Sequence, residues 1–134
     1  MELTLDIAQA SSPYGGTRTH ETATARPIDL VHLARYTLGN TSHEREVLAL
    51  FHIQSDICLK RLESADQERA WREIARTIRN SALDVGAWHV AKSAEDAEAL
   101  RGNALTAFRE AALDALQRDV GEANGYIEAL LAED

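Results

Sequence analysis

Four arginines in the middle of the chain are spaced as neighbours on one face of an α-helix, at steps of three, four and three residues. They are Arg69, Arg72, Arg76 and Arg79, which we call the arginine row. A guanidinium stays protonated at neutral pH and offers only hydrogen-bond donors, in a planar fork that matches carboxylates and phosphates. The row therefore predicts a surface that binds anionic groups. Pairing of the arginines with Glu68 and Glu73 of the same helix is the alternative.

The histidines and the single cysteine do not show the spacing of a metal site or a disulfide. The histidines are His20, His32, His43, His52 and His89. A metal-binding bundle would repeat a Glu-x-x-His pair on two helices, and no such pair recurs here. The single cysteine, Cys58, excludes an internal disulfide, and its place in an apolar stripe is typical of a small core residue. We expect no metal and no cofactor.

Composition narrows the class of protein further. A length of 134 residues supports one domain, and the seven Gly and two Pro argue against an all-β protein. The net charge of −8 disfavours binding to nucleic acid or to an anionic membrane surface. No apolar run approaches the length of a membrane span, and Glu2 and Asp6 interrupt any secretory signal. We expect a cytoplasmic protein that binds neither nucleic acid nor membranes.

The spacing of hydrophobic residues predicts helices from residue 27 onward, after a polar N-terminal segment. Turn-forming residues within 11–17 indicate that residues 1–26 are a flexible N-terminal arm. Residues 27–134 are predicted to form an all-α domain, an up-and-down four-helix bundle with a short leading helix. Pro27 is expected in the first turn of the leading helix, and Thr41 with Glu44 as the capping box of the second. The later helices are expected from about 67 to 85, 87 to 100 and 104 to 132.

Three details of packing follow from the same pattern. Phe108 is expected to point inward from the last helix, in step with the other apolar residues there. Gly86 is expected where two backbones approach closely, because it has no side chain to hold them apart. The last helix also has a second apolar edge, which includes Leu113, Tyr126 and Leu131. This edge is either a dimer contact or the ordinary flank of a long helix that covers the bundle.

The segment 74–88 is the most specific part of the chain, and it resembles the signature of histidine-containing phosphotransfer (HPt) domains. The matching residues are Ala75, Thr77, Ser81-Ala82 and Gly86-Ala87 at the family's spacing, with Ile78 in place of a Leu. The resemblance covers about residues 27–131. It implies a four-helix bundle that works in a bacterial phosphorelay.

The departures from the signature bear on function. Arg76 stands where the family has its phosphoryl-accepting His, Arg79 replaces a Lys, and Asn80 replaces a Gly. Phosphoryl transfer needs an imidazole nitrogen with a free lone pair, which a guanidinium lacks. The resemblance thus implies a degenerate HPt domain without a catalytic residue at the expected position, a pseudo-phosphotransferase rather than an enzyme.

Three functions remain open. In the first, the chain binds a response-regulator receiver domain or a sensor kinase without relaying phosphate. The partner-binding residues would then be Arg69, Arg72, Arg76, Arg79, Asn80 and Leu83. In the second, it is an active phosphotransferase that uses another histidine, such as His89 or His52. In the third, it is a structural bundle that forms a homodimer through the apolar edge of the last helix.

Overall fold

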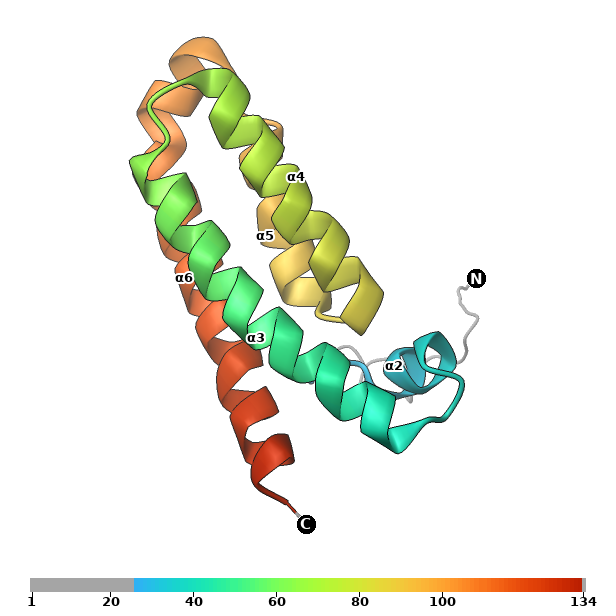
Figure 1. The fold of residues 1–134 in the computed structure, drawn as a ribbon. Helices are drawn as coiled ribbons and strands as arrows, with labels where there is room; N and C mark the ends of the chain where they lie inside the picture. Colours follow the sequence, from blue (N-terminus) through green and yellow to red (C-terminus); the bar gives the residue numbers. More distant parts are fainter. Residues whose placement is uncertain (1–25, 134) are drawn as a thin grey trace, which may run out of the picture.

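The computed structural model describes residues 26–133, and over this range the chain is all-α, with five helices that pack against one another (Figure 1). The helices are α2 (Leu30–Tyr36), α3 (Thr41–Ser64), α4 (Glu68–Val85), α5 (Trp88–Glu98) and α6 (Gly102–Ala132). The all-α prediction is confirmed. The predicted arm, residues 1–26, lies outside the described residues except for Arg26.

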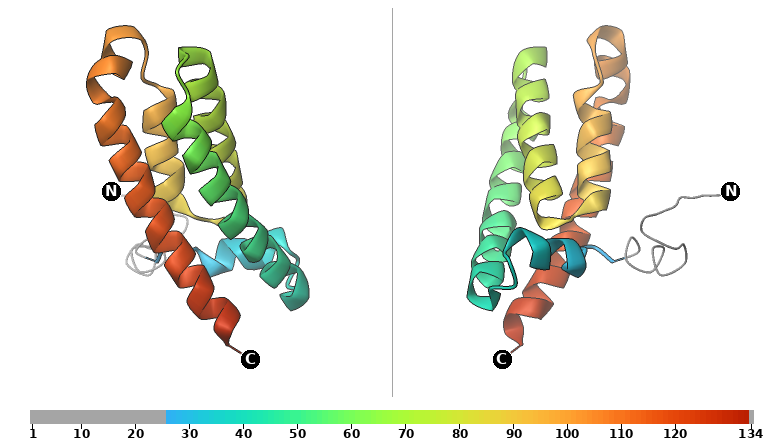
Figure 2. Two further views of the ribbon diagram at one scale, coloured as in Figure 1. Left: turned by 60° about the vertical axis from the view of Figure 1, so that its left-hand side comes forward. Right: turned by 90° about the vertical axis from the view of Figure 1, so that its right-hand side faces the viewer.

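The four long helices form a helical bundle in which each packs against two others. Helix α3 contacts α4 and α6, and α5 contacts the same two helices. The short α2 lies across the end of the α4–α5 hairpin and contacts α4 (Figure 2). The largest fully buried side chains are Trp71, Ile28, Leu33, Leu62, Ile78, Leu116, Ile127, Val90 and Val120. The core thus draws on all five helices and on the residues just before α2.

The prediction for the start of the leading helix is wrong, because Pro27 lies outside it. Helix α2 begins at Leu30, and Asp29 is its N-cap. One carboxylate oxygen of Asp29 accepts hydrogen bonds from the amides of Val31 and His32, each at 3.1 Å. This side chain satisfies two amides that have no partner within the helix, which a proline in the first turn cannot do.

The prediction of a Thr41 capping box is also wrong. Asn40 is the N-cap of α3, and its side-chain oxygen accepts from the amide of His43 at 2.9 Å. Asn caps a helix at least as well as Thr, so the helix begins one residue earlier than the capping-box pattern indicates. The Glu44 carboxylate instead accepts a hydrogen bond from the Thr37 hydroxyl at 3.3 Å.

One expectation for the last helix is wrong as well. Phe108 is 57% exposed, because Arg109 takes the inward position at that turn. The guanidinium of Arg109 lies 4.8 Å from the centre of the Trp71 ring and donates to the last carbonyls of α3. The second apolar edge is the flank of α6 that lies against the bundle, which is one of the two interpretations drawn from the sequence. Leu113 is buried, and Tyr126 and Leu131 pack against the core.

The expectation for Gly86 is confirmed. Gly86 ends α4 in the left-handed conformation, with φ of +79°. Its carbonyl accepts a hydrogen bond from the Asp29 amide at 2.9 Å. A Cβ added at Gly86 would lie 3.0 Å from the Asp29 carbonyl oxygen, so even a methyl group would press on this contact. The turn between α4 and α5 therefore depends on glycine for both its backbone angle and its packing.

Replacing Gly86 with alanine tests this constraint. We expect Gly86→Ala to lower the free energy of unfolding by about 2–3 kcal/mol, since it combines left-handed strain with a steric clash. Gly39→Ala is the matched control: Gly39 has φ of +77° but nothing within 4 Å of its added Cβ. Gly39→Ala should lower the free energy of unfolding by only about 1 kcal/mol. Urea unfolding measures both, and equal losses would contradict the packing argument.

Candidate functional site

All six predicted partner-binding residues lie on one side of α4. The opposite side of this helix is buried against its neighbours through Trp71, Ala75, Ile78, Ala82 and Val85. Arg69, Arg76, Asn80 and Leu83 are exposed, and Arg72 and Arg79 are half-buried. We call these six residues the α4 face. The spacing of polar and apolar residues in the sequence predicted which side of α4 carries these six residues, although Arg72 and Arg79 are half-buried rather than exposed.

The two arginines nearest the start of α4 pair within their own helix. Arg69 Nε lies 3.2 Å from Glu73 Oε2, and Arg72 Nη1 lies 3.5 Å from Glu68 Oε2. Both are pairs of residues four apart, which stabilise a helix by a few tenths of a kcal/mol, about 0.3. The sequence offered self-pairing with Glu68 and Glu73 as an alternative to binding anions. This alternative is correct for Arg69 and Arg72.

The other two arginines share one carboxylate on the neighbouring helix. Arg76 Nε lies 2.9 Å from Oε2 of Glu98, near the end of α5, and Arg79 Nη1 pairs with Oε1 of the same group. The Glu98 side chain is only 14% exposed. Each oxygen of this nearly buried carboxylate therefore has its own guanidinium partner. Glu98 and the two arginines tie α4 to α5.

This pairing changes what Arg76 presents to solvent. The sequence predicted that the arginine row binds anionic groups or pairs within its own helix, whereas one nitrogen of Arg76 is already bound to Glu98 on α5. Its side chain remains 51% exposed, and its two Nη atoms make no hydrogen bond to any residue in 26–133. Arg76 therefore offers an oriented pair of donors rather than a mobile charge. Glu98 itself was missed, because nothing in the sequence shows which α5 residue faces α4.

The histidines that the structure describes all lie away from the α4 face. His52 Nε2 is 2.7 Å from Glu128 Oε2 on α6, and His89 Nδ1 is 3.8 Å from Glu122 Oε1 on the same helix. The His32 ring packs edge-on against Trp88, and His43 lies in the first turn of α3. His20 is outside the described residues. Within residues 26–133, none of these imidazoles lies on the α4 face.

Cys58 and the acidic residues offer no alternative site within the described range. Burial raises the pKa of the Cys58 thiol, and nearby Arg61 offsets this only in part, so the thiol stays protonated at neutral pH. No group of three or more His, Cys, Asp or Glu side chains in residues 26–133 is arranged to hold a metal ion. No helix in this range has the length and apolar character needed to span a membrane.

Comparisons with known protein families, with curated proteins and with solved structures give no match for this chain. The resemblance of segment 74–88 to the HPt signature therefore rests on the residues themselves. The α4 face, with Arg76 near its centre and Glu98 beside it, is the candidate functional site.

Double-mutant cycles should show a larger coupling energy for the ion pairs of Glu98 than for the ion pairs within α4. For Arg79→Ala with Glu98→Ala we expect a coupling energy of about 1 kcal/mol, because Glu98 is nearly buried. The matched cycle, Arg69→Ala with Glu73→Ala, joins two exposed side chains and should give about 0.3 kcal/mol. Urea unfolding of the four variants of each cycle gives both values. Equal couplings would mean that Glu98 does not fix the arginines.

Proposed function

We propose that this chain is an HPt-like domain that binds a response-regulator receiver domain or a sensor kinase without relaying phosphate. Its architecture would be the up-and-down four-helix bundle with a short leading helix that this family uses. The observation that carries the proposal is the family signature along α4, with Arg76 half exposed at the position of the acceptor histidine.

The packing of the signature residues supports the proposal. Ala75, Ile78 and Ala82 are buried beneath the α4 face, and Ala87 is fully buried at the α4–α5 junction beside Gly86. The matching residues are thus largely the ones that build the scaffold. The three departures, Arg76, Arg79 and Asn80, all lie on the outer side of the helix. This distribution is what we expect of a domain that keeps the family's framework and loses its chemistry.

The geometry of Arg76 suits an acidic partner. Receiver domains of this signalling family surround their phosphoacceptor aspartate with further acidic side chains. Glu98 holds Arg76 by its Nε, which leaves both Nη atoms to donate to such carboxylates. A guanidinium already fixed in place loses less side-chain entropy on binding than a free one. The Asn80 carboxamide accepts a hydrogen bond from Arg79 Nη2 at 3.4 Å.

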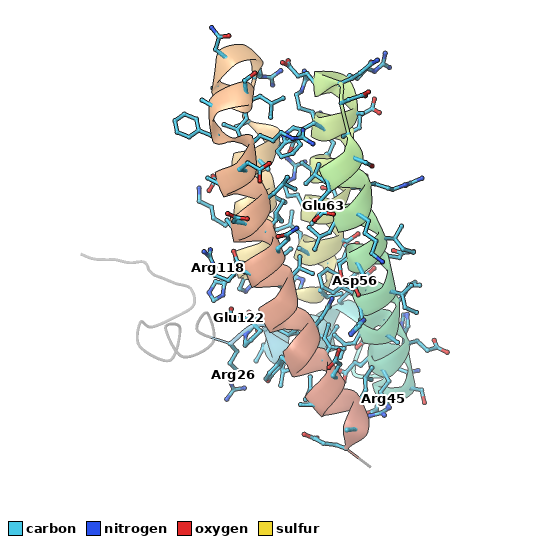
Figure 3. The ribbon with its side chains drawn as sticks, turned by 90° about the vertical axis from the view of Figure 1, so that its left-hand side faces the viewer. Arg26, Arg45, Asp56, Glu63, Arg118 and Glu122 are labelled. Atoms are coloured by element: carbon cyan, nitrogen blue, oxygen red, sulfur yellow. The ribbon has the colours of Figure 1, made fainter. Side chains whose placement is uncertain are left out.

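Charge reversal at Arg76 tests the proposed binding. We expect the chain to bind at least one receiver domain of its own organism, and Arg76→Glu to weaken that binding by about tenfold or more, since one favourable charge contact becomes repulsive. Isothermal titration calorimetry measures both affinities. The matched control is Arg118→Glu, the same change at an exposed arginine of α6 (Figure 3), a helix that packs against α3 and α5.

The control variant should bind as the unaltered chain does, provided that circular dichroism shows both variants folded. Equal weakening by the two substitutions would mean that net charge, rather than the α4 face, governs binding. Absence of binding to every receiver domain and every sensor kinase tested would end the proposal.

An active phosphotransferase is the second candidate, and the exposure of His89 is the observation that favours it. Its side chain is 45% exposed, and Nε2 makes no hydrogen bond within residues 26–133, whereas His52 Nε2 is occupied by Glu128. We expect no transfer of radiolabelled phosphate from a phosphorylated receiver domain to the chain. Acid-labile label that disappears in the variant His89→Gln would contradict this expectation and favour the second candidate.

A triple variant supplies the positive control. Arg76→His, Arg79→Lys and Asn80→Gly together restore the family's signature on α4, and we expect this variant to accept label. The glycine should cost about 1 kcal/mol of helix stability, so folding is checked first by circular dichroism. A folded triple variant that stays unlabelled would show that the docking surface, and not only the acceptor site, departs from the family.

A further inference from the structure

Helix α3 carries a second apolar face that the bundle does not cover. Its core-facing side buries Leu48, Phe51, Ser55 and Leu62. On the opposite side, Leu50, Ile53 and Ile57 are 53%, 57% and 51% exposed. Their spacing of three and four residues places them in one row along the helix, which we call the α3 stripe. Three large aliphatic side chains in a continuous exposed row are typical of a surface that packs against another helix.

The stripe continues onto α2. Tyr36, at the end of that helix, is exposed, and with Leu50 and Gln54 it lines a shallow groove between α3 and α4. Val31 on α2 and Leu38 in the turn between α2 and α3 are also exposed, at 61% and 92%, whereas Leu83 on the α4 face and Phe108 on α6 lie elsewhere. Most of the large exposed apolar side chains of the described residues therefore lie on α2, on the turn that follows it and on the outer side of α3.

Charged residues of opposite sign mark the two ends of the stripe. Glu46 lies four residues before Leu50, and Lys60 and Arg61 lie three and four residues after Ile57. All three are exposed, and none forms an ion pair with another residue in 26–133. If two copies of α3 pair in antiparallel fashion, the Glu46 end of each meets the Lys60–Arg61 end of the other. A parallel pair would instead bring like charges together.

We infer that this chain forms a two-fold symmetric dimer through the α3 stripe. The apolar row supplies the centre of an isologous interface, in which the same patch of both copies is self-complementary. The charged ends select the antiparallel direction. The segment from Glu46 to Arg61 is about 22 Å long at 1.5 Å per residue, so the interface is small and its occupancy depends on concentration.

This dimer would leave the α4 face open. The α4 residues that line the groove beside Leu50 are Ser81, Asp84 and Val85, whereas Arg79 meets α5 on the other side of the helix. The inference is therefore independent of the proposed binding to a receiver domain, and either can fail without the other.

Sedimentation equilibrium of the full chain tests the dimer. We expect the mass to rise with concentration from 14.8 kDa toward twice that value. Ile53→Glu should keep the mass at 14.8 kDa at every concentration, because it buries a charge at the centre of the stripe. The matched control, Phe108→Glu, makes the same kind of change at an exposed apolar residue of α6 and should dimerise like the unaltered chain.

The charged ends give a second test that does not disturb the apolar centre. Glu46→Arg and Arg61→Glu should each weaken self-association, because each creates like-charge contacts at both ends. Mixed in equal amounts, these two variants should form a heterodimer, since every reversed charge then meets its opposite. Failure of the mixture to associate better than either variant alone would refute the antiparallel pairing.

Two further outcomes would overturn the inference. One is a chain that stays monomeric even at millimolar concentration. The other is a dimer that Ile53→Glu leaves intact, which would place the interface elsewhere. If the full chain is monomeric and a chain lacking residues 1–25 dimerises, the N-terminal residues cover the stripe instead, and the inference is replaced by an intramolecular contact.

Discussion

The close contact between Gly86 and Asp29 is the constraint on which the candidate site depends. The Gly86 carbonyl accepts from the Asp29 amide, and the left-handed glycine turns the chain so that α5 runs back along α4. Asp29 also caps α2 with one carboxylate oxygen and accepts from the Trp88 indole with the other, at 3.0 Å. One residue therefore fixes the start of α2, the end of α4 and the start of α5.

The return of α5 along α4 then creates the electrostatics of the α4 face. The Trp71 indole donates to the Ala97 carbonyl at 2.7 Å inside the core, which sets the register of the two helices. That register places Glu98 beside Arg76 and Arg79. Without this tie, the carboxylate would be solvated and both guanidiniums would be free. The α4 face is thus a product of the pairing of two helices, not of the arginine row alone.

The sequence was sufficient to predict what depends on periodicity and local chemistry. The helices, the outer side of α4 and the need for glycine at position 86 all follow from patterns within a single segment. Two predictions failed because a neighbouring residue caps the helix better: Asp29 and Asn40, not Pro27 and Thr41, precede the first turns of α2 and α3. Another failed because of a contact between residues distant in the sequence: Arg109 takes the inward place of Phe108, and its guanidinium lies over Trp71. The pairing of Glu98 with Arg76 and Arg79 also joins residues that are distant in the sequence, so no pattern within a single segment predicts it.

The α4 face and the α3 stripe differ in whether their side chains already have partners within the bundle. On the α4 face each arginine already has a carboxylate partner, so a ligand must compete with or add to pairs that exist. On the α3 stripe the apolar groups have no partner within residues 26–133, and their burial would release ordered water without breaking any contact. For the acidic partner that we propose, these existing pairs favour specific contacts over general attraction by charge. The α3 stripe favours association with whatever matches its row of aliphatic side chains and its opposite charged ends, and another copy of α3 meets both requirements.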